Sequence, residues 1–156
     1  GSLAVVSEFG VGSTFTLEIP FERAELIKEK ALVDEYTEMP LNILIVDDNN
    51  INVILLKHIL ESKGFSPSVA VNGKEAVCQV SVEDFDIVLM DLQMPVMDGY
   101  EAIKCIRENV KITQPRIVVV TAFIADENRE MAIGAGADAF VSKPIDQGEL
   151  FKAIYN

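Results

Sequence analysis

The chain has 156 residues, of which 49% are hydrophobic, and this suits one ordinary domain with a sizeable core and a short appendage. Its formal net charge is −12. That charge argues against nucleic acid or an anionic membrane surface as a partner, and it favours a metal cation or a basic protein surface.

The first 40 residues contain two zones. Residues 1–21 alternate apolar and polar side chains around glycines, which predicts two short strands joined by a Gly-rich turn. A lone hairpin is marginal in water, so we interpret this piece as part of something larger. Residues 22–40 are charged, lack glycine and end at Met39-Pro40, which predicts a linker with some helical tendency.

Residues 41–156 alternate short apolar runs with helical patterns. The runs cover 43–46, 68–71, 87–90, 117–120 and 139–141. Such runs are typical of strands buried on both faces of a parallel sheet. The first helix is expected over 50–63, ending at Gly64, and Asn72, Asp98 and Asp146 each precede a Glu by three residues, as helix caps do. The pattern predicts an α/β fold, a doubly wound (βα)5 domain with a five-stranded parallel sheet.

Polar residues follow the strands at the edge where ligands bind in such sheets. Asp47 and Asp48 follow the first strand, and Asp91 follows the third. Thr121 follows the fourth strand and Lys143 the fifth. The topology should therefore gather three carboxylates, a hydroxyl and an ammonium.

This set is suited to phosphoryl chemistry. Crowded carboxylates raise one another's pKa, and a hard divalent cation such as Mg²⁺ relieves the repulsion. An ionised Asp is itself a nucleophile for phosphoryl groups, so no general base is needed. Lys143 could neutralise phosphoryl charge, and Thr121 could donate a hydrogen bond to it.

Each residue alone also has a simple structural explanation. Asp47 or Asp48 could cap the following helix. Asp91 could be a surface acid, Thr121 a strand-end hydroxyl and Lys143 a solvated charge. The order of all of them at strand ends is the specific signal.

The segments 90–99 (MDLQMPVMDG), 46–49 (VDDN), 120–122 (VTA) and 142–144 (SKP) resemble the receiver domains of response regulators, and the resemblance covers about residues 41–156. It implies a flavodoxin-like fold with Asp91 as the phosphorylated residue. Asp48, Asp91 and the Gln93 carbonyl would bind Mg²⁺, and Asp47 would act through water. Lys143 would pair with the phosphoryl group, ahead of a cis peptide to Pro144.

The resemblance also implies a switch. Thr121 would move toward the phosphoryl group and Phe140 would turn inward, changing the surface over 121–145. Phe140 as a simple core residue is the alternative. Gln93 and Phe123 would flank the phosphoryl group, and with Phe123 as a shield we expect an acyl phosphate that lasts longer than a few seconds.

Residues 7–15 (SEFGVGSTF) resemble the last glycine box of a histidine-kinase ATP-binding domain. The order implies a hybrid histidine kinase as parent protein, whose kinase active site this chain lacks. The chain would catalyse only its own aspartyl phosphorylation and dephosphorylation. Its partners would be the kinase core of the same protein or a histidine phosphotransfer domain, the latter docking near residues 50–53. No nucleic acid and no direct membrane contact are expected.

Other functions are weighed against this one. An aspartyl phosphatase needs a second acid where Gln93 stands, and a flavin-binding domain needs a phosphate loop where Asp47 and Asp48 would repel phosphate. A degenerate receiver that serves only as a protein-interaction module is the remaining alternative. His58 is the only histidine, and we interpret it as a packing or surface residue.

Cellular context follows from what the sequence contains. The two cysteines, Cys78 and Cys105, lack CxxC spacing and are expected to be unpaired thiols. No apolar run approaches the roughly 18 residues of a membrane span. No signal peptide is recognisable. We expect a cytoplasmic chain, with any membrane anchor of the parent protein outside it.

Overall fold

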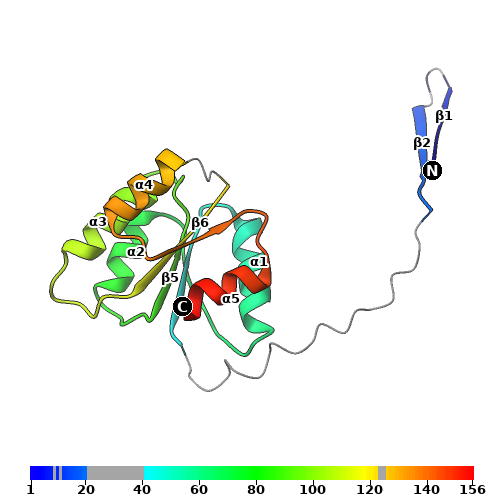
Figure 1. Ribbon diagram of the computed structural model, residues 1–156. Coiled ribbons are helices and arrows are strands. Elements are labelled where there is room, and N and C mark those ends of the chain that lie inside the picture. Colours follow the sequence, from blue (N-terminus) through cyan, green and yellow to red (C-terminus); the bar gives the residue numbers. More distant parts are fainter. Residues whose placement is uncertain (9, 11, 21–40, 123–125) are drawn as a thin grey trace. The chain divides into compact units, whose positions relative to one another are not determined.

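The computed structural model describes residues 1–8, 10, 12–20, 41–122 and 126–156 (Figure 1). The chain divides into two compact units, Gly1–Glu35 and Tyr36–Asn156. The linker expected over residues 22–40 lies outside the described residues.

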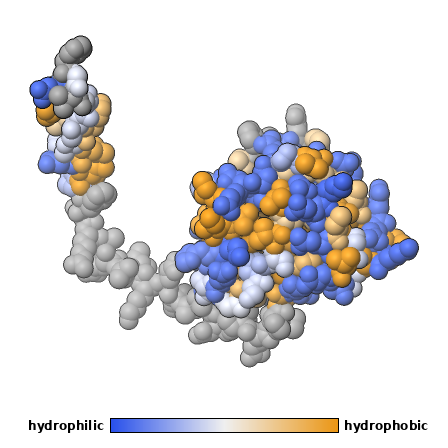
Figure 2. All heavy atoms as spheres, turned by 180° about the vertical axis from the view of Figure 1, so that it is seen from behind, coloured by the Kyte–Doolittle hydropathy of each residue, from blue (hydrophilic) through white to orange (hydrophobic). Residues whose placement is uncertain are grey.

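The first unit contains an antiparallel hairpin of β1 (Ser2–Glu8) and β2 (Gly12–Glu18), which confirms the two predicted strands. Gly10 in the turn has a φ of 82°, a conformation that favours glycine. Alternate residues of the paired strands place four apolar side chains on one face: Leu3, Val5, Phe15 and Leu17. These side chains are 53% to 70% exposed, and Figure 2 shows hydrophobic groups on the surface of the hairpin.

The second unit is built around a five-stranded parallel sheet with the strand order β4-β3-β5-β6-β7. Its strands are β3 (Ile43–Val46), β4 (Ser68–Ala70), β5 (Ile87–Met90), β6 (Arg116–Thr121) and β7 (Ala139–Ser142). These bounds confirm the predicted strands to within one residue at each end. Every residue of β3 and β5 is buried, which explains their continuous apolar sequences.

Helices follow each strand. They are α1 (Asn50–Glu61), α2 (Gly73–Val80), α3 (Gly99–Glu108), α4 (Asp126–Ala135) and α5 (Gln147–Tyr155). The expected caps of α2, α3 and α5 are confirmed, because each accepts a hydrogen bond from a backbone N–H three residues on. The first helix ends at Glu61 and not at residue 63, because the chain turns there through Gly64, whose φ is 87°.

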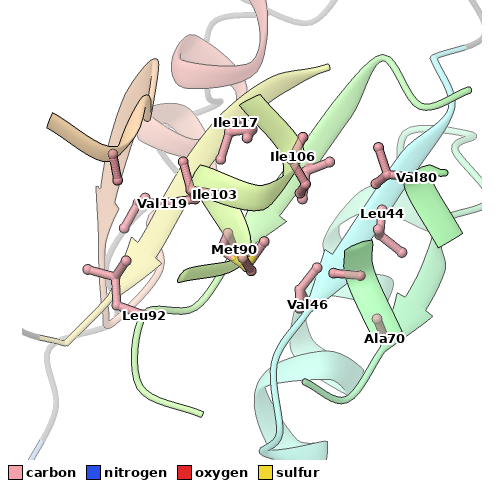
Figure 3. Packing of buried hydrophobic residues seen from close by; sticks show 14 of the residues in the cluster. Leu44, Val46, Ala70, Val80, Met90, Leu92, Ile103, Ile106, Ile117 and Val119 are labelled. Carbon is pink, nitrogen blue, oxygen red and sulfur yellow. The ribbon is translucent and has the colours of Figure 1, made fainter. Parts of the chain in front are cut away.

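The helices cover both faces of the sheet and bury two hydrophobic clusters (Figure 1). Leu44 and Val46 face the cluster that includes residues of α2, α3 and α4, and Ile43 and Ile45 face the one that includes residues of α1 and α5. Figure 3 shows part of the first cluster, with side chains of α3 lying over the strands. The predicted doubly wound (βα)5 sheet is therefore confirmed.

Candidate functional site

The site lies where the order of the strands reverses. From β3 the chain proceeds to β4 on one side and then crosses to β5 on the other side, so that the reversal falls between β3 and β5. Asp47 and Asp48 directly follow β3, and Asp91 directly follows β5. Carboxylate oxygens of these three residues all lie within 4.8 Å of one another. The expected convergence of the acids is confirmed.

Lys143 brings a positive charge to these acids. Its Nζ lies 2.8 Å from Oδ2 of Asp47 and 3.3 Å from Oδ2 of Asp91. The side chain of Lys143 is only 16% exposed. The backbone N–H of Lys143 donates to the Thr121 carbonyl oxygen at 2.9 Å, and the peptide bond to Pro144 is cis, as expected. One ammonium is therefore shared between two carboxylates.

The environment of Asp91 opposes its ionisation. Burial raises the pKa of the Asp91 carboxyl above its ordinary value, the ammonium of Lys143 lowers this pKa in part, and the charge of Asp47 raises it again. Asp91 is 8% exposed and Asp47 is 2% exposed, whereas Asp48 lies at the exposed rim. A cation at this site would stabilise all three carboxylates in their ionised form.

The first turn of α1 holds Asp47. The side-chain nitrogen of Asn52 lies 3.1 Å from Oδ1 and 3.0 Å from Oδ2 of Asp47. The backbone N–H of Asn49 donates to Oδ1 of Asp47 at 2.8 Å. Sequence reasoning missed Asn52; the only signal was a polar residue in the first turn of a largely apolar helix.

The cap of α1 is Asn49. Its side-chain oxygen accepts a hydrogen bond from the backbone N–H of Ile51 at 2.9 Å. This settles the alternative that Asp47 or Asp48 serves as the helix cap. Both carboxylates are left to the cluster beside Lys143 and Asp91.

A tight loop follows Asp91. Oδ1 of Asp91 accepts a hydrogen bond from the N–H of Leu92 at 2.9 Å, and the N–H of Gly99 donates to the Leu92 carbonyl oxygen at 3.0 Å. A Cβ added at Gly99 would lie 2.2 Å from the carbonyl oxygen of Asp91, so only glycine fits there. Val96 has a φ of 74°, which is unusual for a β-branched residue. Gln93 is exposed in the same loop.

The two residues expected to switch lie on neighbouring strands. Thr121 ends β6, pairs in register with Ser142 of β7 and is 3% exposed. Phe140 of β7 is partly buried, and the guanidinium carbon of Arg129 on α4 lies 5.3 Å from the centre of its ring, a cation–π contact. Phe123, the expected shield of the phosphoryl group, lies outside the described residues.

Three other residues considered from the sequence lie apart from this chemistry. His58 is exposed on α1. Cys78 and Cys105 are free thiols, the first exposed and the second partly buried, as expected. The described residues contain no helix that is both long enough and apolar enough to cross a membrane.

The arrangement limits the chemistry. Three carboxylates offer oxygen ligands to a hard cation such as Mg²⁺, and the single charge of Lys143 does not neutralise all three of them. Gln93 stands two residues after Asp91, where an aspartyl phosphatase would need an acid, so no general acid is supplied from that position.

Comparisons with known proteins agree with this geometry. The family model described as "Response regulator receiver domain" matches residues 43–155. The autoinducer 2 sensor kinase/phosphatase LuxQ of Vibrio vulnificus is 34% identical over 165 residues, covering 99% of this chain and 19% of LuxQ. The chain thus spans between about a tenth and a fifth of the length of the curated relatives it matches.

Two solved structures are similar to the second unit. The receiver domain of sensor histidine kinase PA1611 from Pseudomonas aeruginosa, with a magnesium ion coordinated in its active site cleft, has a TM-score of 0.69 and 30% identity, covering 74% of this chain and 95% of that one. The receiver domain of Ssk1 from Saccharomyces cerevisiae belongs to a co-crystal structure with the histidine phosphotransfer protein Ypd1. That match has a TM-score of 0.67 and 32% identity, covering 73% of this chain and 86% of that one.

Proposed function

Because this chain belongs to the response regulator receiver domain family, we propose that it accepts a phosphoryl group on Asp91 from a phosphohistidine. The observation that carries the proposal is the position of the Asp91 carboxylate, which is buried 3.3 Å from Lys143 Nζ and clustered with Asp47 and Asp48. The signalling system in which we place this transfer is a two-component phosphorelay.

Mg²⁺ is the cofactor that this donor set fits. Asp48, Asp91 and the backbone carbonyl of Gln93 would hold the ion, and Asp47 would bind it through water. Support comes from the three carboxylates, whose oxygens all lie within 4.8 Å of one another, and from the magnesium ion in the similar PA1611 domain. When bound, Mg²⁺ supplies positive charge that neutralises phosphoryl oxygens during transfer.

The transfer itself balances simply. A carboxylate oxygen of Asp91 attacks phosphorus, an O–P bond forms, and the N–P bond to the donor imidazole breaks. The electron pair of that bond stays on the imidazole nitrogen, which takes up a proton. Lys143 shifts toward the phosphoryl oxygens from its shared position between Asp47 and Asp91. The hydroxyl of Thr121 donates to a phosphoryl oxygen.

Phosphorylation would then change the surface over residues 121–145. Thr121 would approach the phosphoryl group, and Phe140 would turn inward from its present contact with Arg129. Gln93 and Phe123 would control how fast water reaches the acyl phosphate, and we keep the expectation of a lifetime longer than a few seconds.

A histidine phosphotransfer domain, or the kinase core of the same protein, would supply or receive the phosphoryl group. In the first two turns of α1, Ile51 and Ile54 are 75% and 59% exposed, and an apolar face there could dock such a partner. The Ypd1 complex of the similar Ssk1 domain supports this class of partner. Such relays operate in the cytoplasm, where we place this chain.

The N-terminal hairpin would be the end of a kinase ATP-binding domain in a hybrid histidine kinase. The exposed apolar face defined by Leu3, Val5, Phe15 and Leu17 is consistent with a sheet that continues into a larger domain. The match to LuxQ covers 99% of this chain and so includes the hairpin. The chain itself would carry no kinase active site.

Intact-mass analysis tests the proposed function. The protein is incubated with acetyl phosphate, with and without Mg²⁺, and compared with Asp91→Asn. One phosphoryl adduct on the wild type, absent from the variant and from metal-free samples, is expected. If Mg²⁺ binds but no adduct forms, the chain is a degenerate receiver that acts only as a protein-interaction module.

A further inference from the structure

We propose that Asn52 is a positioning residue whose side-chain amide holds the Asp47 carboxylate in the orientation that serves a hard cation. This inference rests on the proposed phosphoacceptor function and deepens it. It assigns a role to a residue on α1 that contributes no carboxylate to the cluster.

The contacts of Asp47 carry the proposal. Asp47 is 2% exposed, so its carboxylate is oriented mainly by protein groups and not by bulk solvent. One nitrogen of Asn52 spans both of its oxygens, at 3.1 and 3.0 Å. The backbone N–H of Asn49 donates to Oδ1 at 2.8 Å, and Lys143 donates to Oδ2 at 2.8 Å. Asn52 thus contacts both oxygens of the Asp47 carboxylate, whereas Asn49 and Lys143 each contact one.

These donors differ in how firmly they are attached. Asn52 lies in the first turn of α1, which is anchored by the hydrogen bond from Val53 N–H to the Asn49 carbonyl oxygen at 3.1 Å and by the buried side chain of Val53. Lys143 is shared with Asp91, and in the proposed transfer it moves toward the phosphoryl oxygens. Asn52 then remains on Asp47, so the carboxylate keeps its direction while its cationic neighbour changes partner.

The amide is also the suitable chemical group. A Lys or Arg at this position would neutralise Asp47 and weaken the attraction of the cluster for Mg²⁺. An Asp at this position would repel the carboxylate of Asp47. A neutral amide orients the carboxylate by donating hydrogen bonds and leaves its charge available to the ion, as groups that orient metal ligands do.

Magnesium binding to the metal-free full chain tests the role directly. Isothermal titration with Mg²⁺ compares the wild type with Asn52→Leu and Asn52→Ala, which remove the donor, and with Asn52→Gln, which keeps an amide. We expect Leu and Ala to weaken binding by about tenfold, the lower end of losses for groups that orient ligands, and Gln to lose less. Gln147→Leu, an exposed amide in the first turn of α5, is the matched control and should leave binding unchanged.

A kinetic readout separates positioning from general damage. In phosphorylation by acetyl phosphate, the half-saturating Mg²⁺ concentration should rise by the same factor in Asn52→Leu, while the rate at saturating Mg²⁺ falls less. Circular dichroism checks that each variant is folded; if Leu does not fold, Ala and Gln decide. Mg²⁺ affinities within about twofold of wild type in folded Asn52→Ala and Asn52→Leu would overturn the proposal. A wild type that binds Mg²⁺ without being phosphorylated would instead overturn the proposed function alone.

Discussion

At the scale of single residues, burial and charge oppose each other at Asp91. Its carboxyl pKa is raised mainly because the group is buried, and Lys143 only partly offsets this. The site therefore stores unfavourable negative charge in the absence of a cation. This charge favours the binding of Mg²⁺ by the acids, and it should be measurable in the free energy of unfolding.

The pH dependence of stability should reveal this charge. Because the folded-state pKa of Asp91 is raised, its ionised form destabilises the fold at neutral pH. That destabilisation fades as pH falls through the raised pKa, and it is gone below the ordinary Asp pKa of about 3.9. In metal-free urea unfolding, Asp91→Asn should therefore be more stable than wild type at neutral pH, with the difference shrinking toward pH 4. A difference that grows toward acid would contradict this.

Removing the shared ammonium should have the opposite effect. Lys143→Met removes the ammonium that Asp47 and Asp91 share, and we expect a loss of roughly 1–3 kcal/mol in the free energy of unfolding without metal. Mg²⁺ should restore part of this loss, because an ion at the carboxylates replaces the missing charge. Thermal unfolding in EDTA and in Mg²⁺ measures both. Lys57→Met, which removes an exposed ammonium paired with Glu61 on α1, is the control.

The residues of the acidic cluster and Lys143 could be predicted from the sequence, but the hydrogen bonds from Asn52 to Asp47 could not. Asp47, Asp91 and Lys143 follow strands, and parallel topology brings strand ends together, so their proximity was predictable. The contact of Asn52 with Asp47 depends on where α1 begins, and that is set by Asn49 as cap. The start of α1 at residue 50 was predicted, but Asn50 and Asn52 are both polar residues of its first turn, and only the structure shows that Asn52 contacts Asp47.

At the scale of elements, α3 and α1 have separate parts in the site. The start of α3 closes the loop after Asp91, and α1 provides an exposed apolar face. The loop closes through Gly99, whose N–H donates to the Leu92 carbonyl oxygen. The same glycine lets α3 begin against the Asp91 backbone. Sequence placed a helix start after Asp98 correctly, but the close approach that requires glycine is a three-dimensional contact with no local signal.

Gly99→Ala tests this close approach. The added Cβ would lie 2.2 Å from the Asp91 carbonyl oxygen, so the loop or α3 must shift. We expect a loss of roughly 1–3 kcal/mol in stability and a lower rate of phosphorylation at Asp91. Gly134→Ala on α4 is the matched control: its Cβ would meet nothing within 4 Å, and it should raise stability by up to about 1 kcal/mol. Equal effects of the two changes would argue against a special role of Gly99.

The exposed face of α1 gives a prediction about partners. Ile54→Ser removes a side chain in the second turn of α1 that is 59% exposed. If a histidine phosphotransfer protein docks there, transfer from its phosphohistidine should slow by roughly tenfold, as for one central interface residue. The rate with acetyl phosphate should stay unchanged, because that donor needs no docking. Val110→Ser, at a 91% exposed apolar residue after α3, should alter neither rate.

At the scale of the whole molecule, the order of the strands creates the site. Because β3 and β5 are neighbours although α1, β4 and α2 lie between them in sequence, the acids of both strands meet at one edge. The alternation of apolar runs and helical patterns predicted a doubly wound parallel sheet, whereas the order of its strands comes from the structure. The exposed apolar face of the hairpin has no counterpart in that argument, and its role was predicted only from resemblance.

Truncation separates the roles of the two units. A chain of residues 41–156 contains all the strands and helices of the second unit and both hydrophobic clusters. We expect it to bind Mg²⁺ and to be phosphorylated as the full chain is, within about twofold. Titration calorimetry and intact-mass kinetics on both proteins measure this. A truncated chain that is folded but no longer phosphorylated would show that the first 40 residues take part in the reaction.

The most direct test of the central claim identifies the residue that carries the phosphoryl group. Protein treated with acetyl phosphate and Mg²⁺ is reduced with borohydride, which converts an aspartyl phosphate to homoserine, and is then mapped by peptide mass spectrometry. The account predicts homoserine at position 91 and at no other aspartate. Homoserine at position 47 or 48, or a phosphoryl group retained on His58, would contradict it.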